Sequence, residues 1–106
     1  MQATKTIALA LLACLCAGVQ AAEGNAEAAK GKISMCIGCH GIPDYKTAFP
    51  SVYNVPKIGG QHPQYIVAAL SAYKRGERSH PTMRAIAESL SEQDMADLAA
   101  YYGGAK

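Results

Sequence analysis

The stretch Cys36-Ile37-Gly38-Cys39-His40 contains two cysteines separated by two residues, with a histidine directly after the second. Two thiols at this spacing can add to the two vinyl groups of one haem and form two thioether bonds. The histidine that follows is then placed to bind the haem iron from one side. The motif therefore predicts one covalently attached haem c, held by Cys36 and Cys39, with His40 as an axial ligand.

Three other uses of a Cys-x-x-Cys pair compete with haem attachment. A redox disulfide of the thioredoxin kind requires a preceding strand in a βαβ unit, whereas the residues before Cys36 have a helical pattern. A structural zinc site could add two of His40, His62 and His80, although His62 and His80 lie far apart in the sequence. A structural disulfide would close too small a loop to add much stability. We therefore expect haem attachment.

The first residues have the pattern of an export signal. Lys5 precedes an apolar run that begins at Ile7, and the small residues up to Ala21 are suited to cleavage. We expect a cleaved signal peptide over residues 1–21 and one domain over residues 22–106. Export agrees with the motif, because c-type haem is attached outside the bacterial cytoplasm.

Two further cysteines, Cys14 and Cys16, lie inside this expected signal. The segment Leu11-Leu12-Ala13-Cys14 is similar to a bacterial lipobox, and a lipid anchor at Cys14 is the alternative to simple cleavage. We prefer the interpretation that both cysteines are small apolar filler. The apolar run is shorter than the roughly 20 residues that a spanning helix needs, so we expect no transmembrane segment and a periplasmic location.

The expected domain has few large side chains with which to build a core. The chain contains no Trp, and its one Phe is Phe49. A domain of this size and composition usually depends on a disulfide, a metal or a cofactor. From Gly41 to Gly60 the sequence contains three prolines and no regular apolar pattern, which predicts a long loop. Long loops in small domains usually surround something, so this also points to a cofactor.

The spacing of apolar residues predicts an all-α fold with three to four helices and a long loop around one covalent haem. We expect helices from Asn25 to Met35, from Pro63 to Gly76, in a short stretch after Met83, and from Ser91 to about Tyr102. Asn25 and Ser91 are suited to cap helix N-termini, and Ser91 with Asp94 resembles a capping box. Pro63 favours a helix start and Gly76 a helix end.

A haem that carries electrons usually has both axial positions filled, and a methionine thioether raises its reduction potential. The candidates for the sixth ligand are Met35, Met83 and Met95. Met35 directly precedes the haem motif, and Met95 belongs to the apolar stripe of the last helix. We therefore expect Met83 to be the sixth ligand, with His62 or His80 as the alternative in a bis-histidine site.

With these motifs the chain resembles the small class I c-type cytochromes with His/Met ligation. Within that family it is similar to short bacterial carriers related to single-domain halves of di-haem cytochromes. The resemblance runs from about Ala26 to Tyr102. It rests on the haem motif with Gly41, on Pro56-Lys57-Ile58-Gly59-Gly60-Gln61, which is similar to the family's Pro-x-Leu-x-Gly segment, and on Met83 followed by Leu90-Ser91 and the last helix.

The resemblance implies three contacts. The carbonyl of Pro56 would accept a hydrogen bond from Nδ1 of His40, which orients the imidazole and makes it a better donor to iron. Ile58 would pack on the haem ring. Gly31 would let the first and last helices cross closely near the tyrosines at 101 and 102.

The function that follows is diffusible one-electron transfer between redox partner proteins, with donor and acceptor unidentified. The alternatives are a haem subunit docked on a dehydrogenase complex, or a gas- or peroxide-binding haem protein with an open sixth site. We expect no enzyme, because no Ser/His/Asp set stands out and His40 is committed to iron.

The charges are unevenly distributed. The overall net charge is only +2, so we expect no nucleic-acid partner. Residues 45–84 contain six Lys or Arg and one Glu, whereas residues 85–105 contain four acidic residues and no basic one. Two interpretations of the basic stretch remain: ordinary solvated charges, which we favour, and a docking face for an acidic partner. The acidic residues of the last helix are expected to lie on a solvated face.

Overall fold

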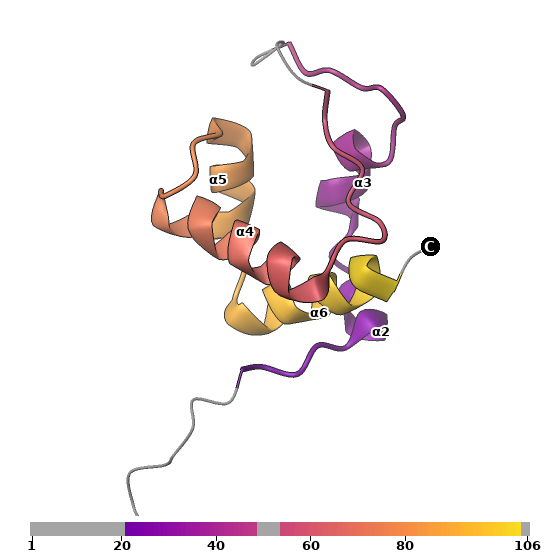
Figure 1. The fold of residues 1–106 in the computed structure, drawn as a ribbon, viewed down its shortest axis with the longest axis vertical. Coiled ribbons are helices and arrows are strands. Elements are labelled where there is room, and N and C mark those ends of the chain that lie inside the picture. Colours follow the sequence, from indigo (N-terminus) through magenta and orange to yellow (C-terminus); the bar gives the residue numbers. More distant parts are fainter. Residues whose placement is uncertain (1–20, 49–53, 105–106) are drawn as a thin grey trace, which may run out of the picture.

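The computed structural model describes residues 21–48 and 54–104 of the chain. Over these residues the regular secondary structure is helical throughout, which confirms the expected all-α fold (Figure 1). The expected signal peptide, apart from its last residue, and the lipidation candidate Cys14 lie outside the described residues. In the described part, no helix has the length and apolar character needed to cross a membrane.

Five helices follow one another along the described chain. They are α2 (Ala26–Ala29), α3 (Ser34–His40), α4 (Pro63–Arg75), α5 (Pro81–Glu88) and α6 (Glu92–Gly104). We expected three to four, and the difference arises at the first one, which is divided in two.

The break in the first helix lies between Ala29 and Ser34. The backbone N–H of Lys32 donates to the carbonyl of Ala29 at 2.8 Å, a tight turn that does not continue the α-helix. Gly31 lies in this turn, and glycine is a poor helix former. The chain resumes as α3, so the Cys-x-x-Cys-His motif lies within a helix and not after one.

The start of α2 is capped as the sequence predicts. The side-chain oxygen of Asn25 accepts hydrogen bonds from the backbone N–H groups of Glu27, at 3.0 Å, and Ala28, at 3.3 Å. These two groups have no partner inside the helix, because its first turn leaves its N–H groups unpaired. The cap therefore stabilises a helix that is only four residues long.

The ends of α4 and α5 are also set by local residues. Helix α4 begins at Pro63 and ends at Gly76, whose φ of 76° is readily adopted only by a residue without a Cβ. Helix α5 begins at Pro81, two residues before the position we expected, because His80 acts as its cap. The Nδ1 atom of His80 accepts the backbone N–H of Met83 at 3.3 Å, which places Met83 in the first turn.

The predicted capping box at the start of α6 is present. The hydroxyl of Ser91 accepts the N–H of Asp94 at 3.1 Å, and the Asp94 carboxylate accepts the N–H of Ser91 at 2.9 Å. The helix continues through Gly103 and ends at Gly104, beyond the end that we expected. A Cβ on Gly103 would lie 2.5 Å from Cγ of Pro63, so this glycine allows α6 to approach the start of α4.

Helix α6 is the centre of the packing and contacts both α2 and α4, while α5 packs on α4 (Figure 1). Its expected apolar stripe is buried and consists of Met95, Leu98, Ala99 and Tyr102. The stripe packs with Ala29 of α2, Ile66 of α4 and Leu90. Ile66, Leu90, Leu98 and Tyr102 of this core also line a cavity between α3 and the helices α4 and α5.

Gly24, and not Gly31, is the glycine of the N-terminal segment that lies close to α6, which corrects the expectation for Gly31. A Cβ on Gly24 would lie 2.1 Å from the carbonyl oxygen of Ala96, whereas a Cβ on Gly31 would meet nothing within 4 Å. The reason is the early end of α2, which places Gly31 in a turn where a Cβ would face open space, although Lys32 of the same turn pairs with α6.

The acidic residues of α6 are not all solvated, contrary to expectation. Asp97 is only 3 % exposed, and its carboxylate accepts the backbone N–H of Asn25 at 2.8 Å. Lys32 forms an ion pair with Asp94 and another, at 3.5 Å, with Asp97. These carboxylates therefore hold the N-terminal helical segment against α6.

Candidate haem-binding site

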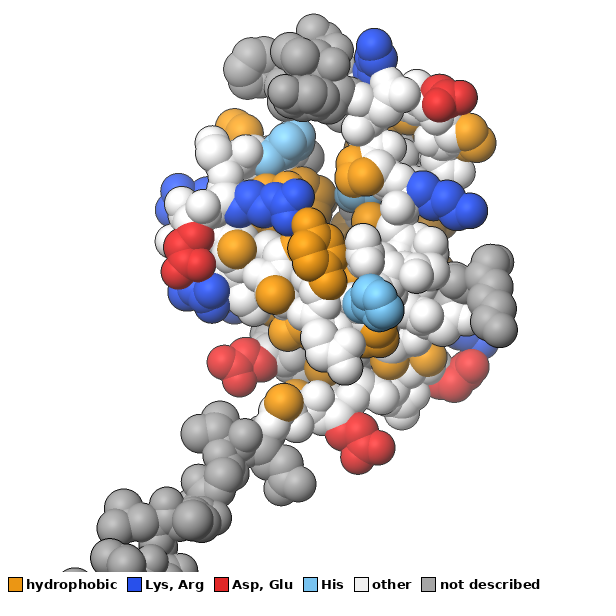
Figure 2. All heavy atoms as spheres, viewed as in Figure 1, with side chains coloured by type: hydrophobic (Ala, Val, Ile, Leu, Met, Phe, Trp, Pro, Cys, Tyr) orange, Lys and Arg blue, Asp and Glu red, His pale blue; other side chains and the backbone are white. Residues whose placement is uncertain are grey.

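A cavity of about 550 Å³ lies between α3 with the following loop on one side and α4 with α5 on the other. Its walls are mainly apolar, and Figure 2 shows the hollow with hydrophobic side chains at its base and basic side chains around it. Sites that enclose small molecules and cofactors usually measure about 300–1,000 Å³. The cavity has the size and character of a cofactor site.

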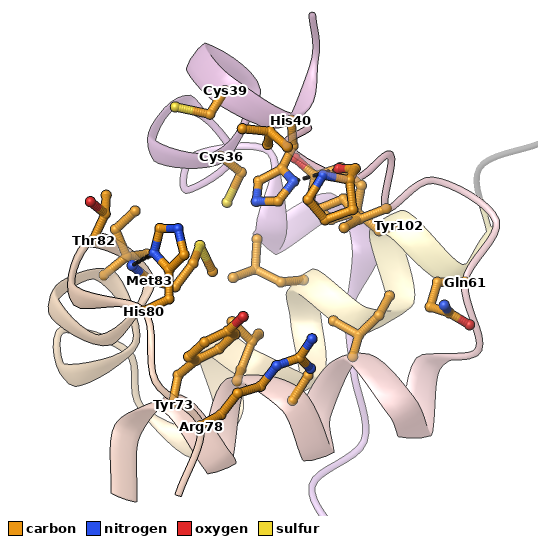
Figure 3. Close-up of a pocket in the computed structure, with 18 of the residues that line it drawn as sticks. Cys36, Cys39, His40, Gln61, Tyr73, Arg78, His80, Thr82, Met83 and Tyr102 are labelled. Carbon is orange, nitrogen blue, oxygen red and sulfur yellow. Dashed lines mark hydrogen bonds between the residues drawn. The ribbon is translucent and has the colours of Figure 1, made fainter. Parts of the chain in front are cut away.

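Helix α3 supplies one wall of the cavity. Cys36, Cys39 and His40 all line it, and both cysteines are free thiols with partly buried side chains (Figure 3). Residues three and four apart share one side of a helix, which explains how a helical motif presents all three groups to one space. Burial raises the pKa of the Cys36 thiol.

His40 is oriented by the loop that follows its helix. Its Nδ1–H donates to the carbonyl oxygen of Pro56 across 2.6 Å, which is the contact implied by the resemblance. A hydrogen bond at Nδ1 leaves Nε2 as the nitrogen available to a metal ion and restricts the rotation of the ring. Figure 3 shows the ring facing the cavity.

Met83 lies on the opposite wall, in the first turn of α5. Figure 3 shows its sulfur pointing into the cavity toward the side that carries His40. His80 also lines the cavity, but its Nδ1 is used to cap α5 through the N–H of Met83. The structure thus brings an imidazole and a thioether together from helices that are distant in sequence.

The other candidates for the sixth ligand are placed less favourably. Met95 is 2 % exposed in the core, where its sulfur accepts a hydrogen bond from the Ser71 hydroxyl at 3.5 Å, and it does not line the cavity. Met35 lines the cavity but belongs to α3, the helix that also carries the cysteines. His62 is exposed and does not line the cavity.

Ile58 lies on the segment that closes the cavity beside His40. It is partly buried, packs against the core and lines the cavity. The N–H of Gly60 donates to the carbonyl of Tyr102 at 2.8 Å, and the N–H of Val55 donates to the carbonyl of Tyr45 at 2.7 Å. These bonds tie the described part of the expected loop to α6 and to itself.

Tyr102 and Arg78 are among the cavity-lining residues that the sequence did not single out for the site. Tyr102 appeared as a core residue, yet its buried hydroxyl lines the cavity and has no hydrogen-bonding N or O partner in residues 21–48 and 54–104. Burial, with the Cys36 thiol beside it, raises the pKa of Tyr102. Arg78 was grouped with the docking charges, and nothing in the sequence distinguishes it from Arg75 or Arg84.

The residues present fit a covalently bound haem. Two thiols, an imidazole and a thioether surround one largely apolar cavity, and these are the groups that attach and ligate haem c. The buried Tyr102 hydroxyl has no N or O partner in the described residues, as expected where a cavity normally holds another group. In the described part, no three His, Cys, Asp or Glu side chains are grouped so that they could hold a metal ion.

Comparison with known proteins agrees with this site. The sequence profile of the family named Cytochrome c matches residues 21–103. Cytochrome c4 of Pseudomonas aeruginosa is 36 % identical over 89 residues, which are 84 % of this chain and 42 % of that protein. Cytochrome c-554(548) of Halomonas halodenitrificans is 37 % identical over 82 residues, covering 74 % of this chain and 94 % of that protein.

A further relative is named as the cytochrome subunit of sulfide dehydrogenase of Chlorobaculum tepidum. It is 31 % identical over 68 residues, which are 64 % of this chain and 57 % of that protein. The chain spans about half the length of the cytochrome c4 relatives that it matches. By its profile match and its haem-binding motif, the chain belongs to the cytochrome c family, which implies covalently bound haem c.

Proposed function

We propose that this chain is a periplasmic one-electron carrier with a single haem c. The observation that carries the proposal is the cavity into which Cys36, Cys39 and His40 project from α3 while Met83 faces them from α5. When bound, the haem iron alternates between its ferrous and ferric states and so accepts or donates one electron.

Different residues of the chain would bind different parts of the haem. Cys36 and Cys39 would form the two thioether bonds, and Nε2 of His40 would bind the iron. The Pro56 carbonyl holds His40 in position through the hydrogen bond to Nδ1. Met83 would bind from the other side, which favours electron transfer over the binding of gases or peroxide at an open site.

The apolar wall of the cavity also has a role. Ile58, Ile66 and Leu70 line the space and would exclude water from both faces of the group. A dry, apolar surrounding disfavours the more highly charged ferric state, and a thioether ligand acts in the same direction. We therefore expect a higher reduction potential than a bis-histidine site would have.

The number of haem groups and the location are part of the same proposal. One Cys-x-x-Cys-His motif supports one haem for each chain, and the signal pattern over residues 1–21 supports export. Donor and acceptor are expected to be other redox proteins. Simple cleavage after Ala21 gives a free carrier, whereas lipidation of Cys14 would attach it to a membrane.

A second function is favoured by one relative, the cytochrome subunit of sulfide dehydrogenase. By that likeness, this chain would be a haem-bearing subunit that remains bound to a dehydrogenase. The two functions differ in the size of the native particle, because a free carrier elutes at the mass of one small chain in gel filtration, and a subunit elutes with its partner.

The proposed function is tested on the exported protein, produced from the full-length chain. A pyridine haemochrome spectrum should show haem with two thioether bonds, at one haem per chain, and acidified organic solvent should not extract it. Release of the protein by osmotic shock should place it in the periplasm. Haem that extracts freely, or more than one haem per chain, would contradict the proposal.

A further inference from the structure

Arg78 directs a charged group into the same apolar cavity. It follows α4, lines the cavity, and its Nη1 donates to the Tyr65 hydroxyl at 3.2 Å. The guanidinium also lies 4.9 Å from the ring centroid of Tyr73, a cation–π distance. Two tyrosines of α4 thus hold this cation at the cavity wall, as Figure 3 shows for Tyr73.

Arg78 differs from the two neighbouring arginines in its partners. Arg75 binds Glu77 with two hydrogen bonds, of 2.8 and 3.0 Å, and Arg84 binds Glu88 at 2.9 Å. No carboxylate of the described chain forms an ion pair with Arg78. Arg78 is exposed at the edge of the cavity. Filling the cavity would remove part of the water around its guanidinium, and a paired anion would offset that loss.

The position of Arg78 indicates where that anion would come from. Figure 3 shows Cys36 and Cys39 at one end of the cavity and Arg78 with Tyr73 at the other. In haem, the two vinyl groups lie on two adjacent pyrroles and the two propionates lie on the remaining two. A haem joined to the cysteines through its vinyl groups therefore carries its carboxylates on the edge away from them.

We propose that Arg78 is a positioning residue that binds a haem propionate and raises the reduction potential of the carrier. This inference rests on the proposed function. The planar guanidinium can form two parallel hydrogen bonds to one carboxylate. A propionate charge favours ferric iron, and neutralising it with a cation in an apolar site removes part of that preference.

Lys57 is the other basic side chain that lines the cavity, and it adjoins Pro56 on the loop. Both side chains are exposed, and Lys57 lies on the segment that supports His40. Arg78 is favoured over Lys57 because two tyrosines already hold its guanidinium at the end of the cavity away from the cysteines. A larger effect of Lys57→Gln than of Arg78→Gln would overturn the assignment.

The test compares the full-length holoproteins of wild type, Arg78→Gln, Arg78→Lys and Arg75→Gln. Arg75→Gln is the matched control, because it removes an arginine three residues away that is paired outside the cavity. The potential is measured by redox titration, and the propionate carboxylate bands are followed by redox-induced infrared difference spectroscopy. The haemochrome spectrum and the far-red ferric band check haem attachment and methionine ligation separately.

We expect Arg78→Gln to lower the potential and shift the carboxylate bands, while Arg75→Gln changes neither. Arg78→Lys keeps the positive charge but lacks the planar guanidinium with its two parallel hydrogen bonds. Its reduction potential should therefore stay near that of the wild type, while its carboxylate bands should shift. Equal potentials in Arg78→Gln and Arg75→Gln overturn the inference. Unchanged carboxylate bands in Arg78→Lys would also overturn the inference. This second outcome can be measured even if the Arg78→Gln protein does not accumulate in the cell. Absence of covalent haem from the wild type would instead refute the proposed function.

Discussion

Met83 and His40 face one cavity from helices that are separated by the whole of α4. The two side chains are held in place by different contacts. His40 is held by the Pro56 carbonyl, and the backbone of Met83 is fixed by the His80 cap. Each proposed ligand therefore has its own support, which keeps the two side chains opposite one another.

Replacing Met83 by Ala should remove the sixth ligand and leave the fold in place. The far-red band of ferric haem bound to methionine should disappear, the potential should fall, and the reduced protein should bind carbon monoxide. Visible spectroscopy and redox titration measure all three effects. Met95→Leu is the control, since Met95 lies in the core and does not line the cavity. Retention of the band in Met83→Ala would show that the ligand lies elsewhere.

Gly24 and Gly31 give a second comparison between single residues. Gly24→Ala should destabilise the protein by about 1–3 kcal/mol, because the added Cβ would lie 2.1 Å from the backbone oxygen of Ala96. Gly31→Ala adds a Cβ in open space and should leave stability equal or slightly higher. Urea unfolding of both variants measures the difference. Equal stabilities would contradict the close contact at Gly24.

Helix α6 is joined to the N-terminal segment by charge as well as by apolar packing. Lys32, from the turn after α2, pairs with Asp94 and Asp97 of α6. The Lys32 ammonium group, followed by hydrogen bonds from Ser91, lowers the pKa of Asp94 to about 2. The backbone N–H of Asn25 and the side chain of Gln93 lower the pKa of Asp97.

The acid stability of the fold should therefore depend on Asp94. Its pKa is 3.8 in an unperturbed chain and about 2 in the folded protein, so its contribution is present above pH 4 and disappears as the pH falls through about 2. Asp94→Asn should lower stability at neutral pH and flatten the pH dependence between about 4 and 2. Thermal unfolding at a series of pH values measures both changes.

The lysine that pairs with Asp94 provides the control. Lys32→Gln should reduce stability in the same direction, and the double variant should lose less than the sum of the two single losses. Additive losses would mean that the two side chains act independently and that the ion pair does not set the acid behaviour.

The described helices surround a cavity and do not form one continuous apolar core. The fully buried apolar residues are few, and the cavity separates α3 from α4 and α5. The covalent group would supply the missing apolar contacts on both walls. Folding and haem attachment are therefore expected to depend on one another.

The double variant Cys36→Ala with Cys39→Ala should consequently lack haem and most of the native helix content. Circular dichroism and thermal unfolding measure the loss. Cys39→Ala alone keeps one possible thioether and should retain more structure than the double variant. A double variant that unfolds cooperatively with the wild-type helix content would show that the chain folds without its cofactor.

The basic stretch has less unpaired positive charge in the structure than its sequence suggests. Basic side chains surround the hollow in Figure 2, and the carboxylates of that view lie mainly toward α2 and α6. Two arginines of the expected docking stretch, Arg75 and Arg84, are paired with Glu77 and Glu88. Docking of an acidic partner on this side stays a prediction, with a weaker local field than the residue count implies.

The sequence by itself indicated haem attachment and the helix boundaries that nearby capping residues set. The spacing of Cys36, Cys39 and His40 is a property of five consecutive residues. The caps at Asn25 and Ser91 and the stop at Gly76 likewise depend on groups within one helical turn. Such features are predictable because the atoms involved are held close together by the chain itself.

Only the tertiary structure decided which distant groups meet. It brought Met83 to the same cavity as His40, two groups that the chain separates by the whole of α4. The close approach to α6 occurs at Gly24 and not at Gly31, and Asp97 is buried. Of the three arginines at 75, 78 and 84, Arg78 is the one that lines the cavity. These outcomes depend on where the chain turns after α2 and α4, and on burial and charge contributed by residues far away in sequence.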